Sequence, residues 1–404
     1  MRLLSPLRVR VVALLWGGLS TSSVGDQLGT IAITWIAVAA LGPAAGYLAA
    51  CQAGVTLLAA LLLGRWLDGR NERRVMIAAD LIRAAVLGGV VLGWAVTGRV
   101  GVVSLAMIVT VLAVGQAAFR PAVQTIMPGL APSEAMLPAI NALFDGTDRL
   151  ARLVGPALIA LAAAWLPVVH FLTVDAASFL VSAAAVLLIG PRATRSVRHD
   201  GSRLASFLQG FRALRRHRLL GFLLYTSGIV NGAWYAALFL GVPLLLTERG
   251  DQAVRMFGAM IACYGVTNLA ANLVVGSRPL PQRPALLSLW GNAVNGIGIA
   301  LIGLCALVPG LPRDSLYAGA MLAGVGGPMN DIPRATLMQT SVPAADVAAG
   351  FRAWIVSANA GLLVAMVVAP TLFARLGPAM GIAALGCLIA ASAFWGLVLR
   401  LDAA

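Results

Sequence analysis

The sequence predicts an all-α integral membrane protein with twelve membrane-spanning helices. Of the 404 residues, 60% are hydrophobic and 11% are charged, and the mean hydropathy is +0.91. A soluble domain has too little interior to bury so much apolar surface. The apolar residues also come in stretches of about 20, the length that a spanning helix needs, with short polar breaks between them. This pattern favours helices over a membrane β-barrel, whose strands alternate every second residue.

The expected spans form two halves of six helices each. They lie at residues 11–39, 44–64, 74–96, 100–126, 138–164, 167–190, 219–246, 254–275, 285–309, 316–340, 351–372 and 379–400. The longest polar interval, 191–218, separates an N-terminal bundle (1–190) from a C-terminal bundle (219–404). In this interval Leu204, Phe207, Leu208, Phe211 and Leu214 recur at helical spacing among arginines. We expect an amphipathic helix on the cytoplasmic membrane surface, with a partner-binding helix as the alternative.

The distribution of arginine sets the orientation. All 29 basic residues are Arg, and with the N-terminus inside, 18 fall on the cytoplasmic side and 5 on the outer side. This is the positive-inside bias of membrane proteins. It explains the net charge of +14 without a nucleic-acid partner. We therefore expect a multi-pass protein of the bacterial inner (cytoplasmic) membrane with both termini in the cytoplasm.

Patterns for cofactors and catalysis are missing from the sequence. The four cysteines stand singly in apolar spans, and the three histidines are scattered. Without a P-loop, ATP is not the expected energy source. We expect no metal, no cofactor and no enzyme activity.

The loop after the second span carries a charged motif. It reads Gly64-Arg-Trp-Leu-Asp68-Gly-Arg70-Asn-Glu-Arg73-Arg74. The order of a Gly, three residues, an Asp and a basic cluster resembles the loop between helices two and three of the major facilitator superfamily. It departs from the family pattern at Gly69 and Glu72, where basic residues are common.

This resemblance implies a conformational latch. In the family the Gly lets two helices approach, and the Asp lies against the N-terminal end of a helix from the other half, where the helix dipole favours an anion. Gly64, Asp68, Arg70, Arg73 and Arg74 would then stabilise one conformation. The alternative is an ordinary turn whose arginines reach the lipid headgroups.

The fifth span carries a second motif, Arg149-Leu-Ala-Arg152-Leu-Val-Gly155-Pro156. It resembles the motif of antiporters in the same superfamily. With Asn141, Phe119-Arg120-Pro121 and Asp80-Leu-Ile-Arg83, the first half is similar to the third drug:proton antiporter branch, which includes macrolide-efflux and siderophore-export proteins. Pro156 cannot donate a backbone hydrogen bond, and Gly155 has no side chain. We therefore predict a functional hinge here. The alternative is an ordinary proline kink.

Ionisable residues inside the spans need a partner or a function, since each costs roughly 2.5–3.5 kcal/mol to insert. Helical spacing predicts four ion pairs: Asp80 with Arg83, Asp145 with Arg149, Asp148 with Arg152, and Asp331 with Arg334. Asp80, Arg120 and Asp145 lie at a similar depth. We therefore expect a charge network of Asp80, Arg83, Arg120, Arg149 and Arg152 that holds spans three to five together.

Asp26 is the first candidate for proton coupling. Ser23, Asp26, Gln27, Thr30 and Thr34 share one face of the first span, which lines the central cavity in the fold that the resemblance implies. A carboxylate so placed is partly desolvated, which favours its neutral form. Asp145, Asp148 and Asp331 are the next candidates, and a structural hydrogen-bonding role for Asp26 is the alternative. For Asp175 we expect a hydrogen bond to a neighbouring helix.

The second half offers amides and aromatic rings in place of charges. The candidates for lining a substrate cavity are Gln27, Thr30, Thr34, Asn231, Trp234, Tyr235, Tyr264, Asn268, Asn330 and Asn359. For most of the asparagines we expect a helix-to-helix hydrogen bond, whereas those on the seventh, eighth, tenth and eleventh spans could face the cavity. Amides beside aromatic rings suit an amphipathic organic substrate.

These features predict a twelve-helix major facilitator that works as a monomer. We expect it to export an amphipathic organic molecule, such as a drug, a secondary metabolite or a siderophore, in exchange for protons by alternating access. The alternatives are an importer, a lipid or metabolite carrier, and a membrane receptor that transports nothing.

Overall fold

The computed structural model describes residues 5–67, 71–131, 136–190, 203–247, 252–278, 281–308, 314–399 and 401. These residues are helical and contain no strand. The long helices are α1 (Arg10–Leu41), α2 (Ala45–Leu67), α3 (Glu72–Thr97), α4 (Val102–Leu130), α5 (Leu137–Ala162), α6 (His170–Leu188), α7 (Arg203–Arg215), α8 (Arg218–Ala236), α10 (Ala253–Gly276), α11 (Pro284–Leu307), α12 (Ser315–Ser341) and α13 (Ala344–Val398). A π-helix, Ala237–Gly241, joins α8 to the short α9 (Val242–Thr247).

Eight helical segments of the described residues are long and apolar enough to cross a membrane. Two of them, Arg10–Ala59 and Ala349–Val398, have 50 residues each, whereas one crossing needs about 20. The first is broken by the short 3-10 turn Gly42–Ala44. The second is broken at Gly377, whose φ of 75° departs from helical geometry just before Pro378. Both breaks lie where the sequence predicted a loop between two spans.

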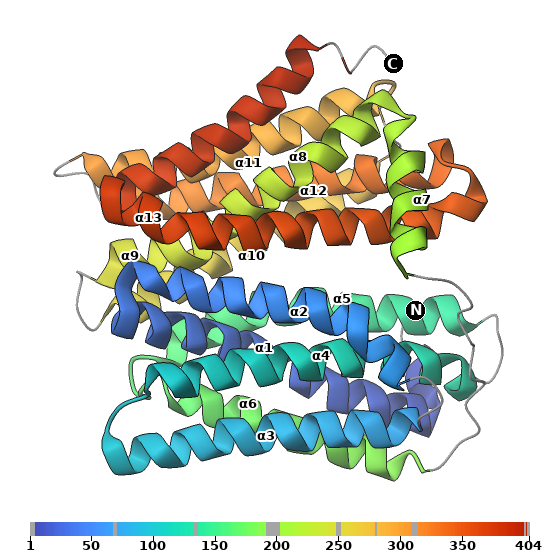
Figure 1. Cartoon of the computed structure of the whole chain (residues 1–404), viewed down its shortest axis with the longest axis vertical. Helices are drawn as coiled ribbons and strands as arrows, with labels where there is room; N and C mark the ends of the chain where they lie inside the picture. The colour runs from blue at the N-terminus through green and yellow to red at the C-terminus, as the bar shows by residue number, and fades with distance from the viewer. Residues whose placement is uncertain are drawn as a thin grey trace. The chain divides into compact units, whose positions relative to one another are not determined.

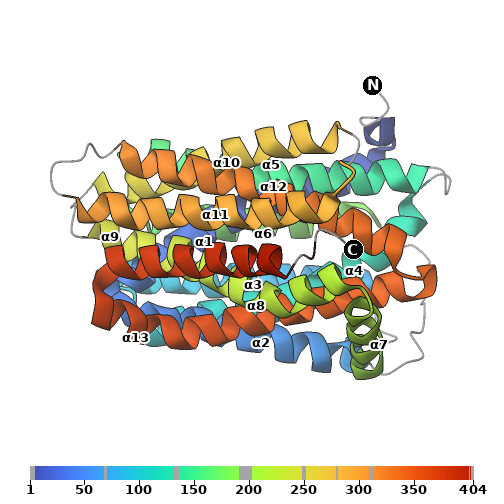
Figure 2. The same ribbon diagram turned by 90° about the horizontal axis from the view of Figure 1, so that it is seen from above.

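The chain forms two compact units (Figures 1 and 2). The N-terminal unit comprises Met1–Ala40 and Gly54–Asp200, and the C-terminal unit comprises Leu41–Ala53 and Gly201–Ala404. The start of α2 belongs to the C-terminal unit because it packs closely on α13. A Cβ atom on Gly46 would lie 2.8 Å from Cγ of Pro370.

In the N-terminal unit, α3 packs against both α4 and α6. A buried apolar cluster draws Leu15 from α1, Met76 from α3, Phe119 from α4, Ile140 from α5 and Val186 from α6. These helices are therefore fixed to one another at the end of the unit where α3 begins and α6 ends.

In the C-terminal unit, α11 packs on α12 and α13, α8 packs on α13, and α10 packs on α12. Glycines bring several of these helices into backbone contact. The Cα atom of Gly228 on α8 lies so close to Gly361 on α13 that a Cβ atom there would overlap it. Small residues at such crossings are the usual means of packing helices in a membrane.

The amphipathic helix α7 packs on the C-terminal unit, across the start of α13 (Figure 1). Leu214 is buried in an apolar cluster with residues of α12 and α13. The Gln209 amide donates a hydrogen bond to Oδ1 of Asp346 at 2.7 Å. Leu214, one of the apolar residues expected at the membrane surface, therefore packs against protein, and the position of the helix at the membrane stays a prediction.

Candidate functional site

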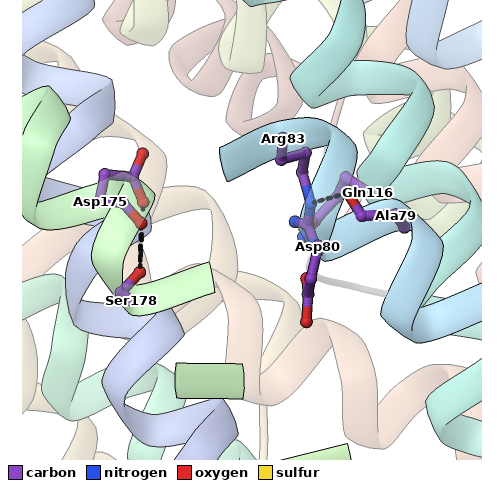
Figure 3. A network of polar contacts seen from close by, with 6 residues as sticks. All are labelled: Ala79, Asp80, Arg83, Gln116, Asp175 and Ser178. Atoms are coloured by element: carbon purple, nitrogen blue, oxygen red, sulfur yellow. Dashed lines mark hydrogen bonds and ion pairs between the residues drawn. The ribbon is translucent and has the colours of Figure 1, made fainter. Parts of the chain in front are cut away.

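A buried ion pair lies at the centre of the N-terminal unit. Asp80 and Arg83 of α3 form the predicted i,i+3 pair, with side chains that are 0% and 2% exposed. Arg83 also donates to Oε1 of Gln116 on α4 and to the carbonyl oxygen of Ala79, both at 3.4 Å (Figure 3). The guanidinium thus links α3 to α4.

Aromatic rings cover the same guanidinium. The Cζ atom of Arg83 lies 4.1 Å from the ring centroid of Phe179 on α6 and 4.9 Å from that of Phe119 on α4. Gly115 leaves room for the side chain, because a Cβ atom there would lie 2.7 Å from Cδ of Arg83. Rings at these distances stabilise the cation and exclude water. Arg83 is therefore a permanent buried positive charge.

Asp175 of α6 is a second buried carboxylate, 1% exposed. The Ser178 hydroxyl donates to the backbone oxygen of Asp175 at 2.7 Å and lies 3.5 Å from its Oδ1 (Figure 3). The carboxylate faces Gly25 and Gly29 of α1, and a Cβ atom on Gly29 would overlap its Oδ2. The sequence prediction, a hydrogen bond to a neighbouring helix, missed this contact. The sequence feature that could have indicated this contact is the pair of glycines at i and i+4 on α1, Gly25 and Gly29.

Asp26 lies beside this contact, because it follows Gly25 in α1. Its side chain is partly buried, and it is within electrostatic reach of Arg83, Asp80, Arg120 and Asp148. Asp175 is in turn within reach of Asp26 and Arg83. Among the described residues, the carboxylates of Asp26, Asp80 and Asp175 therefore lie within electrostatic reach of the buried guanidinium of Arg83, and Asp80 forms an ion pair with it. We call these four residues the carboxylate cluster.

The charge network continues to α5 through Arg120 and Asp148, which pair at 3.7 Å with side chains that are 62% and 43% exposed. The Ser23 hydroxyl of α1 donates to Oδ1 of Asp148 at 2.6 Å. The predicted pair of Asp148 with Arg152 is therefore wrong, and Asp148 joins α4 and α1 instead. The side chains of Asp145 and Arg149 lie outside the described residues.

The predicted hinge touches α1 next to Asp26. Gly155 and Pro156 are buried in α5, and a Cβ atom on Gly155 would overlap Cβ of Gln27. This contact holds the Gln27 side chain at the α1–α5 crossing. On the same helix Thr30 is exposed and Thr34 is partly buried.

Part of the predicted latch can be placed. Gly64 lies in the last turn of α2, whereas Asp68 and Arg70 are outside the described residues. Arg73 donates to the carbonyl oxygens of Val186 and Leu187 at 3.1 and 2.7 Å. These are carbonyls of the last turn of α6, where a cation is stabilised by the helix dipole. The amide of Arg74 donates to Asn71, the N-cap of α3, at 3.1 Å.

The C-terminal unit collects aromatic rings at its π-helix. Tyr235 and Phe239 are stacked with centroids 4.7 Å apart, and Trp234 lies 6.0 Å from Tyr264 on α10. The Trp234 indole donates to the Tyr264 hydroxyl at 3.1 Å. A π-helix turns side chains away from their α-helical positions and is frequent at functional sites. We call Trp234, Tyr235, Phe239 and Tyr264 the aromatic cluster.

Most of the predicted cavity amides bond helix to helix. The Asn231 amide donates to the Ala358 oxygen of α13 at 3.1 Å, and Asn330 accepts from the Ser288 hydroxyl of α11 at 2.6 Å. Asn268 donates at 3.1 Å to the Gly324 oxygen, which Pro328 cannot satisfy within α12. Asn359 bonds within α13, to the oxygen of Ile355 at 2.8 Å.

Asp331 and Arg334 of α12 form the second predicted i,i+3 pair, at 2.7 Å. Asp331 is 63% exposed, whereas Arg334 is 12% exposed and lies over the ring of Trp354, with Cζ 3.9 Å from its centroid. Unlike the carboxylate of Asp80, that of Asp331 is exposed at the surface of the protein.

Comparisons with known proteins agree with this architecture. Over 326 residues, 27% are identical to the multidrug efflux pump Tap of Mycobacterium tuberculosis and of Mycobacterium bovis, covering 77% of this chain and 75% of the relative. The solved structure of the nucleoside transporter NupG is similar with a TM-score of 0.73 at 11% identity, over 96% of this chain and 99% of that one. A peptide transporter of the POT family has a TM-score of 0.71 at 13% identity, over 97% and 95% of the two chains.

At such identities the solved structures establish the fold alone. The sequence profile of one family matches residues 15–292, which is more than half of the chain. The chain therefore belongs to the Major Facilitator Superfamily.

Proposed function

We propose that this protein exports amphipathic organic molecules in exchange for protons, by alternating access of twelve spanning helices arranged as two halves of six. The observation that carries the proposal is the carboxylate cluster of the N-terminal unit. It places three acids within electrostatic reach of one buried arginine, which pairs with one of them.

The imbalance of charge is the reason to expect proton binding. Arg83 can compensate one carboxylate, and an uncompensated ion in a low-dielectric interior costs several kcal/mol. The remaining carboxyl groups are therefore stable when they hold a proton, or when the site opens to water and they can ionise. A site that gains protons in one state and loses them in another is what proton coupling requires.

The substrate class follows from the C-terminal unit. The aromatic cluster offers ring faces together with indole and phenol groups, which suits an apolar molecule with a few polar atoms. The similar protein Tap is described as a multidrug efflux pump. Both support an amphipathic organic substrate, of which drugs, secondary metabolites and siderophores are examples.

We further propose that both termini lie in the cytoplasm and that Asp68 acts as a conformational latch. The latch is supported by Arg73, a basic residue of the same motif, which donates to carbonyl oxygens in the last turn of α6. Replacing Asp68 with Asn should shift a balanced conformational equilibrium severalfold, since an anion at a helix N-terminus contributes about 1 kcal/mol. Transport should fall while binding of the substrate persists, and unchanged transport at equal expression would refute the latch.

The proposal is tested in proteoliposomes with ethidium as the probe. Ethidium is a permanent cation, so a pH gradient alone does not trap it inside a vesicle. An exchange of substrate for protons should concentrate ethidium in vesicles with an acidic lumen, and a proton-linked importer should do so only when the outside is acidic. The control is the same vesicles after the pH gradient has been collapsed by a protonophore.

Accumulation into the acidic lumen that the protonophore abolishes supports the proposal. Accumulation driven by an acidic exterior contradicts export and favours the importer. Equal uptake with and without the gradient contradicts proton coupling.

A further inference from the structure

We infer that α6 carries a proton path in which the hydroxyls of Ser182 and Ser178 connect Asp80 to Asp175. The inference rests on the proposed proton coupling and adds the route by which a proton crosses the N-terminal unit. It assigns a role to two serines that were not among the candidates predicted from the sequence.

The three groups on α6 are aligned. Asp175, Ser178 and Ser182 are at positions i, i+3 and i+7, which lie on one face of an α-helix. Their side chains are 1%, 4% and 0% exposed. From Asp175 to Ser182 the helix rises by about 10 Å. This face therefore carries a row of buried polar groups along α6.

Asp80 lies at one end of this row. The Ser182 hydroxyl is close enough to act on the Asp80 carboxylate. That contact is poorly aligned: Oδ2 of Asp80 and Oγ of Ser182 are both buried, and neither makes a well-formed hydrogen bond with a residue that the structure describes. A buried polar atom without a partner costs about 1–3 kcal/mol. Two such atoms beside each other indicate a place that a proton or a water molecule occupies in part of the cycle.

Asp175 lies at the other end. It accepts from Ser178, and the glycines of α1 let its carboxylate approach the backbone beside Asp26 (Figure 3). The charged groups that act on it are Asp26 from α1 and Arg83 from α3. Beyond Asp26 are Arg120 on α4 and Asp148 on α5. A proton that arrives at Asp175 therefore neutralises one of two adjacent carboxylates.

The transfer is a chain of hydrogen-bond exchanges. Asp80 gives its proton to the Ser182 oxygen, and Ser182 releases its own hydroxyl proton to a water molecule between the two serines, which are one turn apart. The water passes a proton to Ser178, and Ser178 passes its own to Asp175. Each hydroxyl and the water gain one proton and lose one, so the net change is one proton moved from Asp80 to Asp175.

The test compares Ser182→Ala and Ser178→Ala with a matched control, Ser227→Ala. Ser227 is also a buried helical serine, 5% exposed, but it lies in the C-terminal unit and bonds to the Leu224 oxygen at 2.7 Å and to Ser357 at 3.1 Å. Each variant is reconstituted, and ethidium accumulation driven by the pH gradient is measured beside ethidium counterflow without a gradient. Thermal unfolding in detergent reports stability.

The path predicts that both α6 variants lose at least about tenfold in the rate of proton-driven accumulation, as expected when a group that relays a proton is removed. Counterflow should be unchanged, and Ser227→Ala should match the parent in both assays. Ser182→Ala should unfold close to the temperature of the parent, because the hydroxyl that it removes makes no well-formed hydrogen bond.

Two α6 variants with the proton-driven rate of the parent would overturn the path and leave the proposed function intact. An equal fall of counterflow and driven transport would also overturn it, because the serines would then have a structural role. If the parent itself shows no response to the pH gradient, the proposed coupling fails, and the path fails with it.

Discussion

The two units of this transporter bury different kinds of polar group. The buried polar residues of the N-terminal unit include the ions Asp80, Arg83 and Asp175, whereas those of the C-terminal unit are neutral, namely Ser227, Ser288, Asn292, Asn295 and Asn330. A buried amide can be satisfied permanently by a backbone oxygen, as Asn295 is by the Ala323 oxygen at 2.9 Å. A buried carboxylate needs a counter-charge or a proton. Among the residues that the structure describes, the fully buried carboxylates therefore belong to the N-terminal unit, and the energy of its interior depends on their protonation.

The helices are also held together differently. In the C-terminal unit, backbone contacts at Gly228 and Gly361 and similar crossings bind the helices at short distance. In the N-terminal unit the guanidinium of Arg83 contacts rings from α4 and α6 and so helps to hold these helices to α3. Close backbone contacts therefore hold the helices of the C-terminal unit together, whereas a buried charge contributes to this in the N-terminal unit.

The largest effect is expected for Asp26→Asn in the N-terminal unit. The amide keeps the shape of the carboxyl group but cannot titrate. Proton-driven accumulation of ethidium should fall by at least about tenfold, while exchange without a gradient continues. The matched variant, Asp331→Asn, removes an exposed acid of the C-terminal unit and should keep most of the proton-driven transport. A larger loss of proton-driven transport in Asp331→Asn than in Asp26→Asn would contradict the assignment of proton coupling to the N-terminal unit.

The next effect concerns stability. Arg83→Gln leaves the buried Asp80 without its counter-charge, which should lower the free energy of unfolding by about 3–5 kcal/mol. Arg334→Gln leaves an exposed Asp331, so its cost should be about 1 kcal/mol or less. Thermal unfolding of both purified variants measures the difference. Equal losses of unfolding free energy in the two variants would contradict the claim that the buried ion pair is found in the N-terminal unit and the exposed one in the C-terminal unit.

A smaller effect tests packing. Gly361→Ala adds a Cβ atom that would overlap Gly228, so α8 and α13 must separate, at a cost of about 1–3 kcal/mol. Gly88→Ala on α3 is the control, because a Cβ atom there meets nothing within 4 Å. Unfolding temperature should fall for the first variant and stay unchanged or rise for the second, because Ala favours a helix more than Gly does. A Gly361→Ala variant as stable as the parent would contradict the claim that a close glycine contact holds α8 and α13 together.

The smallest effect concerns His217, the N-cap of α8, whose Nδ1 accepts from the amide of Leu220 at 3.4 Å. Burial lowers the pKa of His217 below its ordinary value of 6.5. The neutral ring is the acceptor, so this stabilisation is complete above pH 6.5 and is lost as the pH falls below it. We expect a loss of about 1 kcal/mol at most. Thermal unfolding at pH 7.5 and pH 5.5 measures it, and His217→Ala should show less of this pH dependence than the parent.

Local spacing was sufficient to predict what happens within one helix. The pairs of Asp80 with Arg83 and of Asp331 with Arg334 are confirmed, because residues three apart on a helix are neighbours wherever the helix packs. The breaks at Gly42–Ala44 and Gly377 also fall in predicted loops. These features depend on the chain itself and need no knowledge of neighbouring helices.

Contacts between helices could not be predicted in the same way. A spanning helix is apolar on all sides, so its sequence does not reveal which side faces which neighbour. Asp148 was assigned to Arg152 on its own helix, yet it pairs with Arg120. The approach of Asp175 to Gly29 depends on the crossing of α1 and α6. The π-helix at Ala237–Gly241, which arranges the aromatic cluster, left no pattern that we recognised.

The central claim is that protons exchange with substrate in the N-terminal unit. The most direct measurement is the proton release that follows addition of ethidium to purified protein in weakly buffered detergent solution, followed with a pH indicator. The account predicts release by the parent and by Asp331→Asn, and none by Asp26→Asn although this variant still binds ethidium. Undiminished release by Asp26→Asn, or its loss in Asp331→Asn, would contradict the claim.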